Sequence, residues 1–167
     1  MLRELHQELG IPDDYGRDGG PPIFDEALDL VEVGPNLVGL TQRLTPLTAE
    51  RWASMVAAAE VADIPLLLVS GFRSVDYQAR LIRKKINAGH AIDEILSVNA
   101  APGYSEHHTG QAVDIATPGS RPLTEEFETT AAFAWLSENA VNFGFSMTYP
   151  RDNPWGFIYE PWHWSIK

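Results

Sequence analysis

The sequence contains no cysteine. This absence excludes disulfide scaffolds, thiol nucleophiles, cysteine-ligated zinc and iron–sulfur clusters. A chain of 167 residues can bury roughly 68–70% of the surface that its unfolded form exposes, so its stability does not require a metal. Any metal that it binds for another purpose must be held by histidine and carboxylate side chains.

Basic residues are scarce. The chain has 12 Lys and Arg residues and 23 Asp and Glu residues, which gives a formal net charge of −11. A nucleic-acid-binding surface needs clustered Lys and Arg to replace the counterions of the phosphates. The one basic run is 83–85, which we interpret as a solvated helix face. We therefore expect no nucleic-acid partner.

Long apolar runs are also missing. The longest stretch without a charged residue runs from Asn139 to Pro150, whereas a membrane-spanning helix needs about 20 apolar residues. We expect no transmembrane segment. The first ten residues lack the apolar region of a signal peptide. The expected location is the cell envelope or periplasm if a signal has been removed, and the cytoplasm otherwise; a monomer is favoured.

The acidity is concentrated at the amino end, where residues 1–50 hold 3 basic and 10 acidic residues together with Pro/Gly-rich patches. We interpret residues 1–47 as an acidic, irregular lead-in with one short helix near 24–31. Residues 48–167 are expected to form a single domain.

Apolar spacing and turn residues predict the elements of that domain. Thr48 is expected to cap a helix over 48–62, Ser74 a helix that ends at Gly89, and Thr124 a helix that ends at Gly144. Strands are expected over 66–69, 111–116, 145–149 and 157–164. Helices interleaved with short strands predict an α+β domain in which the helices pack on a mainly antiparallel sheet.

Two segments hold candidate metal ligands. In the first, His107 precedes Asp114 by seven positions, with a bend expected at Thr109-Gly110. In a strand after that bend, Val113 faces one side and Asp114 the other. A carboxylate on a core strand is costly to bury unless a cation lies beside it.

The second segment joins Glu160 and His163 through Pro161, which fixes the backbone between an acid and an imidazole. Two histidines and one carboxylate leave the fourth position of a tetrahedral zinc ion open, and a second carboxylate nearby could accept a proton from water. These residues have the composition of a metallohydrolase site.

Each candidate also has a structural interpretation. Asp114 could cap a turn, His163 could be a hydrogen-bonded core imidazole, and Arg73 could form a surface ion pair. The remaining histidines, His6, His90 and His108, are assigned no chemical role. Spacing alone leaves the zinc and structural interpretations evenly balanced.

Four motifs together resemble the zinc D-alanyl-D-alanine carboxypeptidases of the VanY-like group. The motifs are Ser-Gly-Phe-Arg-Ser at 70–74 with Gln78, Ser-x-His-x-x-Gly-x-Ala-x-Asp at 105–114, Trp-Leu-x-x-Asn-Ala-x-x-Phe-Gly-Phe at 135–145 leading to Tyr-Pro at 149–150, and Glu-Pro-Trp-His at 160–163. The resemblance covers residues 48–164. The larger family includes D-Ala-D-Ala dipeptidases, phage L-alanyl-D-glutamate endopeptidases and the Hedgehog-type fold.

The resemblance implies a role for each matching residue. His107, Asp114 and His163 would bind Zn²⁺, Glu160 would be the catalytic base, and Arg73 would polarise the scissile carbonyl. Ser105 and Gln78 would bind substrate. One departure is that Ser165 and Ile166 follow His163-Trp164 where a basic residue is expected, so the group that holds the substrate carboxylate is left open.

The function implied is a zinc metallopeptidase that hydrolyses a peptide bond of the peptidoglycan stem peptide and releases terminal D-Ala. An endopeptidase that cuts inside the stem is the alternative. A non-catalytic, zinc-stabilised binding module is a further alternative, which Glu160 and Arg73 disfavour because neither is needed to hold a metal.

Overall fold

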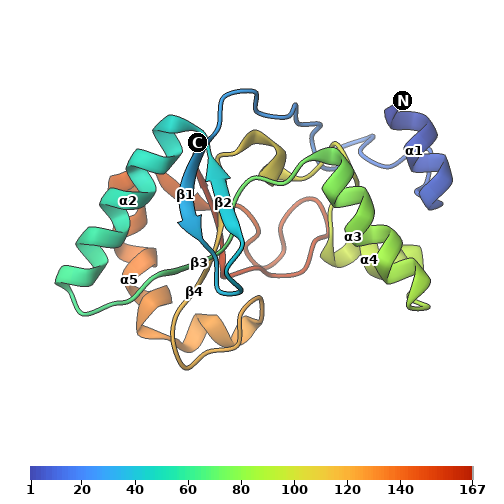
Figure 1. Ribbon diagram of the computed structural model, residues 1–167. Helices are drawn as coiled ribbons and strands as arrows, with labels where there is room; N and C mark the ends of the chain where they lie inside the picture. The colour runs from blue at the N-terminus through green and yellow to red at the C-terminus, as the bar shows by residue number, and fades with distance from the viewer. Residues whose placement is uncertain (167) are drawn as a thin grey trace.

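The computed structural model describes residues 1–166, so Lys167 at the end of the expected domain lies outside the described residues. The described chain forms an α+β fold with two antiparallel sheets (Figure 1). Its α-helices are α1 Leu2–Leu9, α2 Pro46–Val61, α3 Val75–Asn87, α4 Ile92–Val98 and α5 Ala131–Asn139. Short 3₁₀ helices are η1 Glu106–Thr109, η2 Glu125–Thr129 and η3 Ala140–Phe143. The expected fold class is confirmed.

The larger sheet has four strands in the order β3-β4-β6-β5, and every neighbouring pair is antiparallel. These strands are β3 Leu67–Ser70, β4 Ala112–Ala116, β5 Phe145–Met147 and β6 His163–Ile166. A separate hairpin consists of β1 Val31–Pro35 and β2 Thr41–Leu44. Strand β6 comes last in the described chain but lies inside the sheet.

The main core fills the space between one face of the larger sheet and helices α2 and α5. Val113, Ile115 and Trp164 point from the sheet into this core, against Met55 of α2 and Leu136 of α5. Burying an apolar side chain of this size contributes roughly 1.5–3 kcal/mol. Because side chains alternate along a strand, the residues between these apolar positions lie on the opposite face.

A second, smaller core joins α1 to α3 and α4. Leu9 and Ile11 at the amino end pack with Ile82 of α3 and Ile95 of α4. Figure 1 shows α2 and α5 at one end of the molecule, α1, α3 and α4 at the other, and the strands between them. The boundary expected at residues 47 and 48 stays a prediction, although the first helix belongs to this packed cluster.

The helix predicted near 24–31 is wrong, because residues 21–30 form neither a helix nor a strand. Phe24 donates its backbone N–H to Gly103, and Ala27 donates to His108. Leu28, within the predicted helix, is fully exposed. The backbone N–H groups of Phe24 and Ala27 therefore donate to residues in or just before η1 instead of forming the hydrogen bonds of a helix.

Three other boundaries differ from the prediction. Helix α2 is capped by Thr45, with Pro46 at its first turn, and Thr48 lies inside it. The helix expected from Thr124 is divided into η2 and α5, because the Thr130 side chain accepts the Phe133 N–H and starts a new helix. The strand expected over 157–164 begins only at His163.

The other predicted elements are present within a few residues of their expected ends, including the helix that Ser74 caps. Within residues 1–166, no helix combines the length and the apolar character needed to cross a bilayer.

Candidate metal centre and active site

Strand register brings Asp114 and His163 together. Asp114 of β4 pairs directly with His163 of β6, and the adjacent pair is Val113 with Trp164. Because Val113 and Trp164 face the main core, Asp114 and His163 share the opposite face. The Asp114 Oδ1 atom lies 3.0 Å from His163 Nδ1. The predicted orientation of Asp114 is confirmed, and its partner His163 lies 49 residues later in the chain.

Helix η1 carries His107 to the same point. It ends at Gly110, whose φ of 64° provides the left-handed turn into β4, a conformation that glycine adopts without strain. The His107 Nδ1–H donates to the Gly71 carbonyl at 2.7 Å. His107 Nε2 is thereby left with its lone pair directed at Asp114, 3.2 Å from Oδ2.

These three side chains fit a metal ion. One ligand atom from each of His107, Asp114 and His163 lies within 4.8 Å of the others, and all three residues are buried. Ligands bound at 2.0–2.1 Å in a tetrahedral zinc site are separated by about 3.3 Å, close to the two distances given above. His107 Nε2 is also buried without a hydrogen-bond partner, which a bound cation would supply.

Glu106 is a buried acid that the sequence analysis did not identify. Its Oε2 atom lies 2.8 Å from His163 Nε2 and 2.6 Å from the Thr148 hydroxyl, which is 3.0 Å from Ser165 Oγ. A carboxylate at that distance accepts the Nε2 proton and leaves Nδ1 facing the metal position. An acid that orients a ligating histidine is a regular feature of zinc sites.

The charges of the ligands depend on one another. Burial alone would raise the pKa of Asp114, but His107 and His163 beside it hold that pKa well below its usual range. Burial, reinforced by the charge of Arg73, lowers the pKa of His107 to about 4. Burial would also lower the pKa of His163, but its hydrogen bonds to Asp114 and Glu106 raise it. The site thus holds Asp114 ionised and His107 neutral, and a bound metal ion would displace the second proton that these acids favour on His163.

Glu160 lies beside the ligand group without belonging to it. Its Oε2 atom is 3.8 Å from His163 Nδ1, and its side chain is 13% exposed. The turn that presents it is fixed by backbone bonds from Glu160 N to Tyr149 O and from His163 N to Glu160 O. Burial raises the pKa of Glu160 to about 7. A carboxyl group in this range can both accept and donate a proton near neutral pH.

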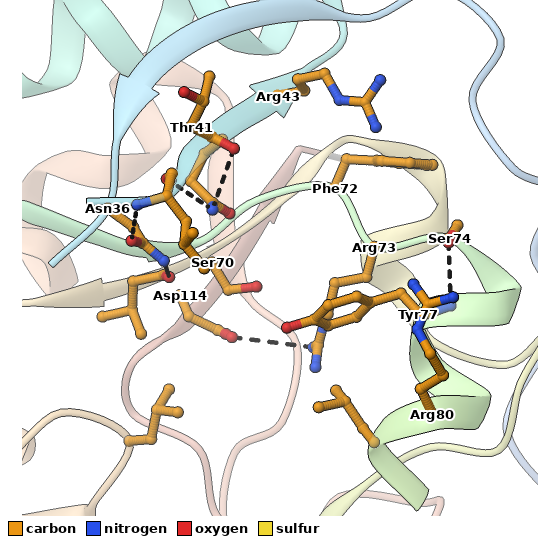
Figure 2. Close-up of a pocket in the computed structure, with 15 residues that line it drawn as sticks. Asn36, Thr41, Arg43, Ser70, Phe72, Arg73, Ser74, Tyr77, Arg80 and Asp114 are labelled. Atoms are coloured by element: carbon orange, nitrogen blue, oxygen red, sulfur yellow. Dashed lines mark hydrogen bonds and ion pairs between the residues drawn. The ribbon is translucent and has the colours of Figure 1, made fainter. Parts of the chain in front are cut away.

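Arg73 lies between β3 and α3, and its side chain reaches Asp114. Its Nη2 atom is 4.0 Å from Asp114 Oδ2, as the dashed line in Figure 2 shows. Its Nε atom is buried without a hydrogen-bond partner in the described chain. The guanidinium group therefore has a free donor at the site.

Two hollows meet at Arg73. One is a cavity of about 570 Å³ that extends from Asp114 past Tyr77 to β2 and α3. The other measures about 30 Å³ and is lined by His107, Glu160 and His163 together with Gln78 and Ser105. By the same measure a water molecule needs about 10–15 Å³, so only a small group fits the second hollow.

The structure brings every predicted site residue to this centre. Gln78 and Ser105 are buried in the wall of the small hollow. Gln78 donates through Nε2 to Ala100 O, and its Oε1 atom has no hydrogen-bond partner among the described residues. Within residues 1–166, four side-chain nitrogen or oxygen atoms are buried without a hydrogen-bond partner. Three of them belong to the site, on Arg73, Gln78 and His107. Unsatisfied buried polar atoms are rare in folded proteins, so this concentration indicates a ligand-binding position.

The other histidines lie outside the metal group. His108 is buried, but its Nδ1–H donates to Arg73 O and its Nε2 accepts the Gly103 N–H. It belongs to η1 rather than to an extended segment. His6 bonds to Pro102 O, and His90 lies near Glu94 at the surface. These three imidazoles contact protein groups away from the metal group.

Comparison with known sequences gives concordant matches. The family model described as "VanY: D-alanyl-D-alanine carboxypeptidase" matches residues 41–166. The protein YodJ of Bacillus subtilis is 35% identical over 118 residues, which are 69% of this chain and 43% of that protein. The chain thus spans less than half the length of this relative.

Solved structures share the fold. The LdcB LD-carboxypeptidase superposes with a TM-score of 0.74 at 30% identity, covering 87% of this chain and 71% of that one. The vancomycin-resistance D,D-pentapeptidase VanY, solved in complex with Zn(II), superposes with a TM-score of 0.64 at 25% identity, covering 91% of this chain and 84% of that one.

Proposed function

Because the chain belongs to the VanY family of D-alanyl-D-alanine carboxypeptidases, we propose that it is a zinc-dependent peptidase that removes terminal D-Ala from the peptidoglycan stem peptide. The observation that carries this proposal is the convergence of a three-residue metal group, Glu160 and Arg73 at one point between a large and a small hollow. A site built only to hold a metal would need neither the acid nor the guanidinium.

His107, Asp114 and His163 would hold the zinc ion, with Glu106 fixing the orientation of His163. A bound zinc ion supplies Lewis-acid polarisation of the scissile carbonyl and increases the acidity of a nearby water molecule. The protein contributes fixed ligand geometry and a largely buried setting, in which electrostatic interactions are stronger than in water.

Glu160 accepts the proton of the attacking water as the water oxygen bonds to the carbonyl carbon. When the C–N bond breaks, the same carboxyl group returns that proton to the leaving amine of D-Ala. Arg73 donates hydrogen bonds toward the carbonyl oxygen, where negative charge develops in the transition state. With a pKa near 7, the Glu160 carboxyl group can take up and give back a proton within one reaction cycle.

The unequal hollows support cleavage at the end of the peptide. The residue after the scissile bond would lie on the side of Gln78 and Ser105, next to the small hollow that His107, Glu160 and His163 also line. The limited space on this side suits the small methyl side chain of alanine better than a long side chain or a continuing peptide. The rest of the stem would extend into the large cavity.

A second candidate differs only in the residue before the cut. The likeness to the LdcB LD-carboxypeptidase supports removal of D-Ala from a tetrapeptide, where the preceding residue has the L configuration. Both activities release the same single amino acid.

The test is to incubate the zinc-loaded protein with stem pentapeptide and tetrapeptide, and to identify the products by mass spectrometry. Loss of one D-Ala from the pentapeptide alone supports D,D-carboxypeptidase activity, and loss from the tetrapeptide alone supports the L,D alternative. Amidation of the terminal carboxylate should slow cleavage at least about tenfold, because charge-assisted hydrogen bonds are lost. Cleavage inside the stem would indicate an endopeptidase, and no cleavage of any peptide would indicate a binding module.

A further inference from the structure

The large cavity has a basic wall in an acidic protein. Three arginines line it: Arg43 from β2, Arg73 after β3, and Arg80 from α3 (Figure 2). The one acidic residue in that lining is Asp114, which belongs to the metal group. Since the whole chain carries a net charge of −11, this wall differs in sign from the protein as a whole.

Arg43 and Arg80 are also available for a ligand. Arg83, Arg121 and Arg151 each form an ion pair with a glutamate. No such pair forms for Arg43 or Arg80 within residues 1–166. Their guanidinium groups instead lie 5.5 Å from the Phe72 ring and 5.7 Å from the Tyr77 ring, respectively.

The aromatic contacts leave hydrogen-bond donors free. A guanidinium group near the face of an aromatic ring keeps the N–H donors at its edge, and those donors match the two oxygens of a carboxylate. Both arginines are exposed. An anion can therefore reach their N–H donors without any rearrangement of buried side chains.

We propose that this cavity is an acidic-stem subsite, in which Arg43 and Arg80 bind carboxylate groups of the stem peptide on the amino side of the scissile bond. The proposal rests on the proposed function, because that function places the upstream part of the stem in this cavity. The shared chemistry is a free carboxylate, which can come from a γ-linked D-glutamyl residue or from a diamino acid with a second carboxyl group. The subsite makes the enzyme selective for stems in which these groups are not amidated.

The test compares matched pentapeptides on the zinc-loaded protein. One pair differs only in whether the γ-linked D-glutamyl residue carries a free carboxylate or an amide. A second pair differs in whether the third residue is lysine or a diamino acid with a second carboxylate. Exposed ion pairs are modest in strength, so each arginine should contribute about twofold to fivefold. The wild-type protein should prefer a free carboxylate in at least one pair by about tenfold in kcat/KM.

Substitution of Arg43 and Arg80 tests whether these two residues cause the preference for a free carboxylate. The double variant Arg43→Ala/Arg80→Ala should reduce the tenfold preference to about twofold or less. The pair whose preference shrinks identifies the source of the carboxylate. Arg83→Ala is the matched control, because Arg83 lies on the same helix but pairs with Glu8 outside the cavity; it should keep the preference.

A binding measurement separates recognition from turnover. Calorimetry with Glu160→Gln should give a dissociation constant about tenfold lower for the preferred carboxylate peptide than for its amide. The triple variant Glu160→Gln/Arg43→Ala/Arg80→Ala should lose this difference. Equal rates and equal binding for both members of each pair would overturn the subsite while leaving the peptidase intact. Failure to cleave or bind any of these peptides would overturn both proposals.

Discussion

The two sides of Arg73 differ in how firmly their side chains are held. On the metal side, His107 and His163 are almost fully buried, and each has one ring nitrogen fixed by a protein acceptor. On the cavity side, Arg43 and Arg80 are exposed, and each lies near one aromatic ring.

This difference separates two requirements. A metal site needs ligands within a few tenths of an ångström of their positions, and burial with a fixed tautomer provides that accuracy. A peptide subsite needs charge of the right sign and room to adjust. We therefore expect large, salt-insensitive effects from substitutions on the buried side, and small, salt-sensitive effects on the exposed side.

The largest effect should follow removal of a ligand. His107→Ala leaves two protein ligands, so it should lose bound zinc and all metal-dependent turnover. The measurement is zinc per chain after gel filtration. His90→Ala, which removes an exposed imidazole, should keep the metal. Full zinc content in His107→Ala would disprove the ligand assignment.

Glu160→Gln should keep zinc and the fold but slow turnover by roughly 10²–10⁴-fold, the usual range for a positioned general base. Metal content and kcat are measured on the same preparation. Loss of zinc in this variant would make Glu160 a ligand, and unchanged turnover would remove it from the mechanism.

Arg73→Lys should be nearly as damaging as Arg73→Ala, with a loss of about 10²-fold or more in kcat/KM. A planar fork aimed at a developing oxyanion is not replaced by a flexible ammonium group. If Arg73→Lys hydrolysed the peptide at the wild-type rate, positive charge alone would be sufficient at this position.

Glu106→Ala should weaken zinc binding about 10- to 100-fold, because His163 loses the acceptor that orients it. Competition with a chelator of known affinity measures this change without turnover. Glu106→Gln keeps an acceptor oxygen and should recover part of the affinity. Equal zinc affinity in all three proteins would show that the buried acid serves packing alone.

The smallest effect should come from salt. Raising the ionic strength from about 0.05 to about 0.5 M shortens the screening length, so KM for the preferred carboxylate peptide should rise a few-fold. Zinc content should not change, because the ligands are buried. An equal rise in KM for the amide peptide would show that the exposed arginines do not cause the salt dependence.

Local patterns predicted much of the fold. The Ser74 cap, the apolar strand before it and the alternation around Asp114 depend on neighbouring residues, and all three are confirmed. The helix near 24–31 is wrong because its backbone bonds to Gly103 and His108, about 80 residues away. Apolar spacing carries no information about such distant partners.

The site residues also fall into those that local motifs identified and one that depends on a distant partner. His107, Asp114, Glu160, His163 and Arg73 were identified through motifs, and the structure brings them together. Glu106 was missed because an acid between a serine and a histidine resembles a surface residue. Its role depends on His163, 57 positions later. A signal was present, since Glu106 stands inside the motif that supplies two ligands.

The position of β6 has a consequence for how the chain is made. This strand is last of the described strands in sequence, yet it lies between β4 and β5 and supplies His163. A nascent chain that has not reached residue 163 therefore leaves β4 and β5 without the strand that both pair with, and it has two of the three ligands. The sheet and the metal centre can be completed only after β6 leaves the ribosome, so until then the emerging segment is vulnerable to strand-to-strand association.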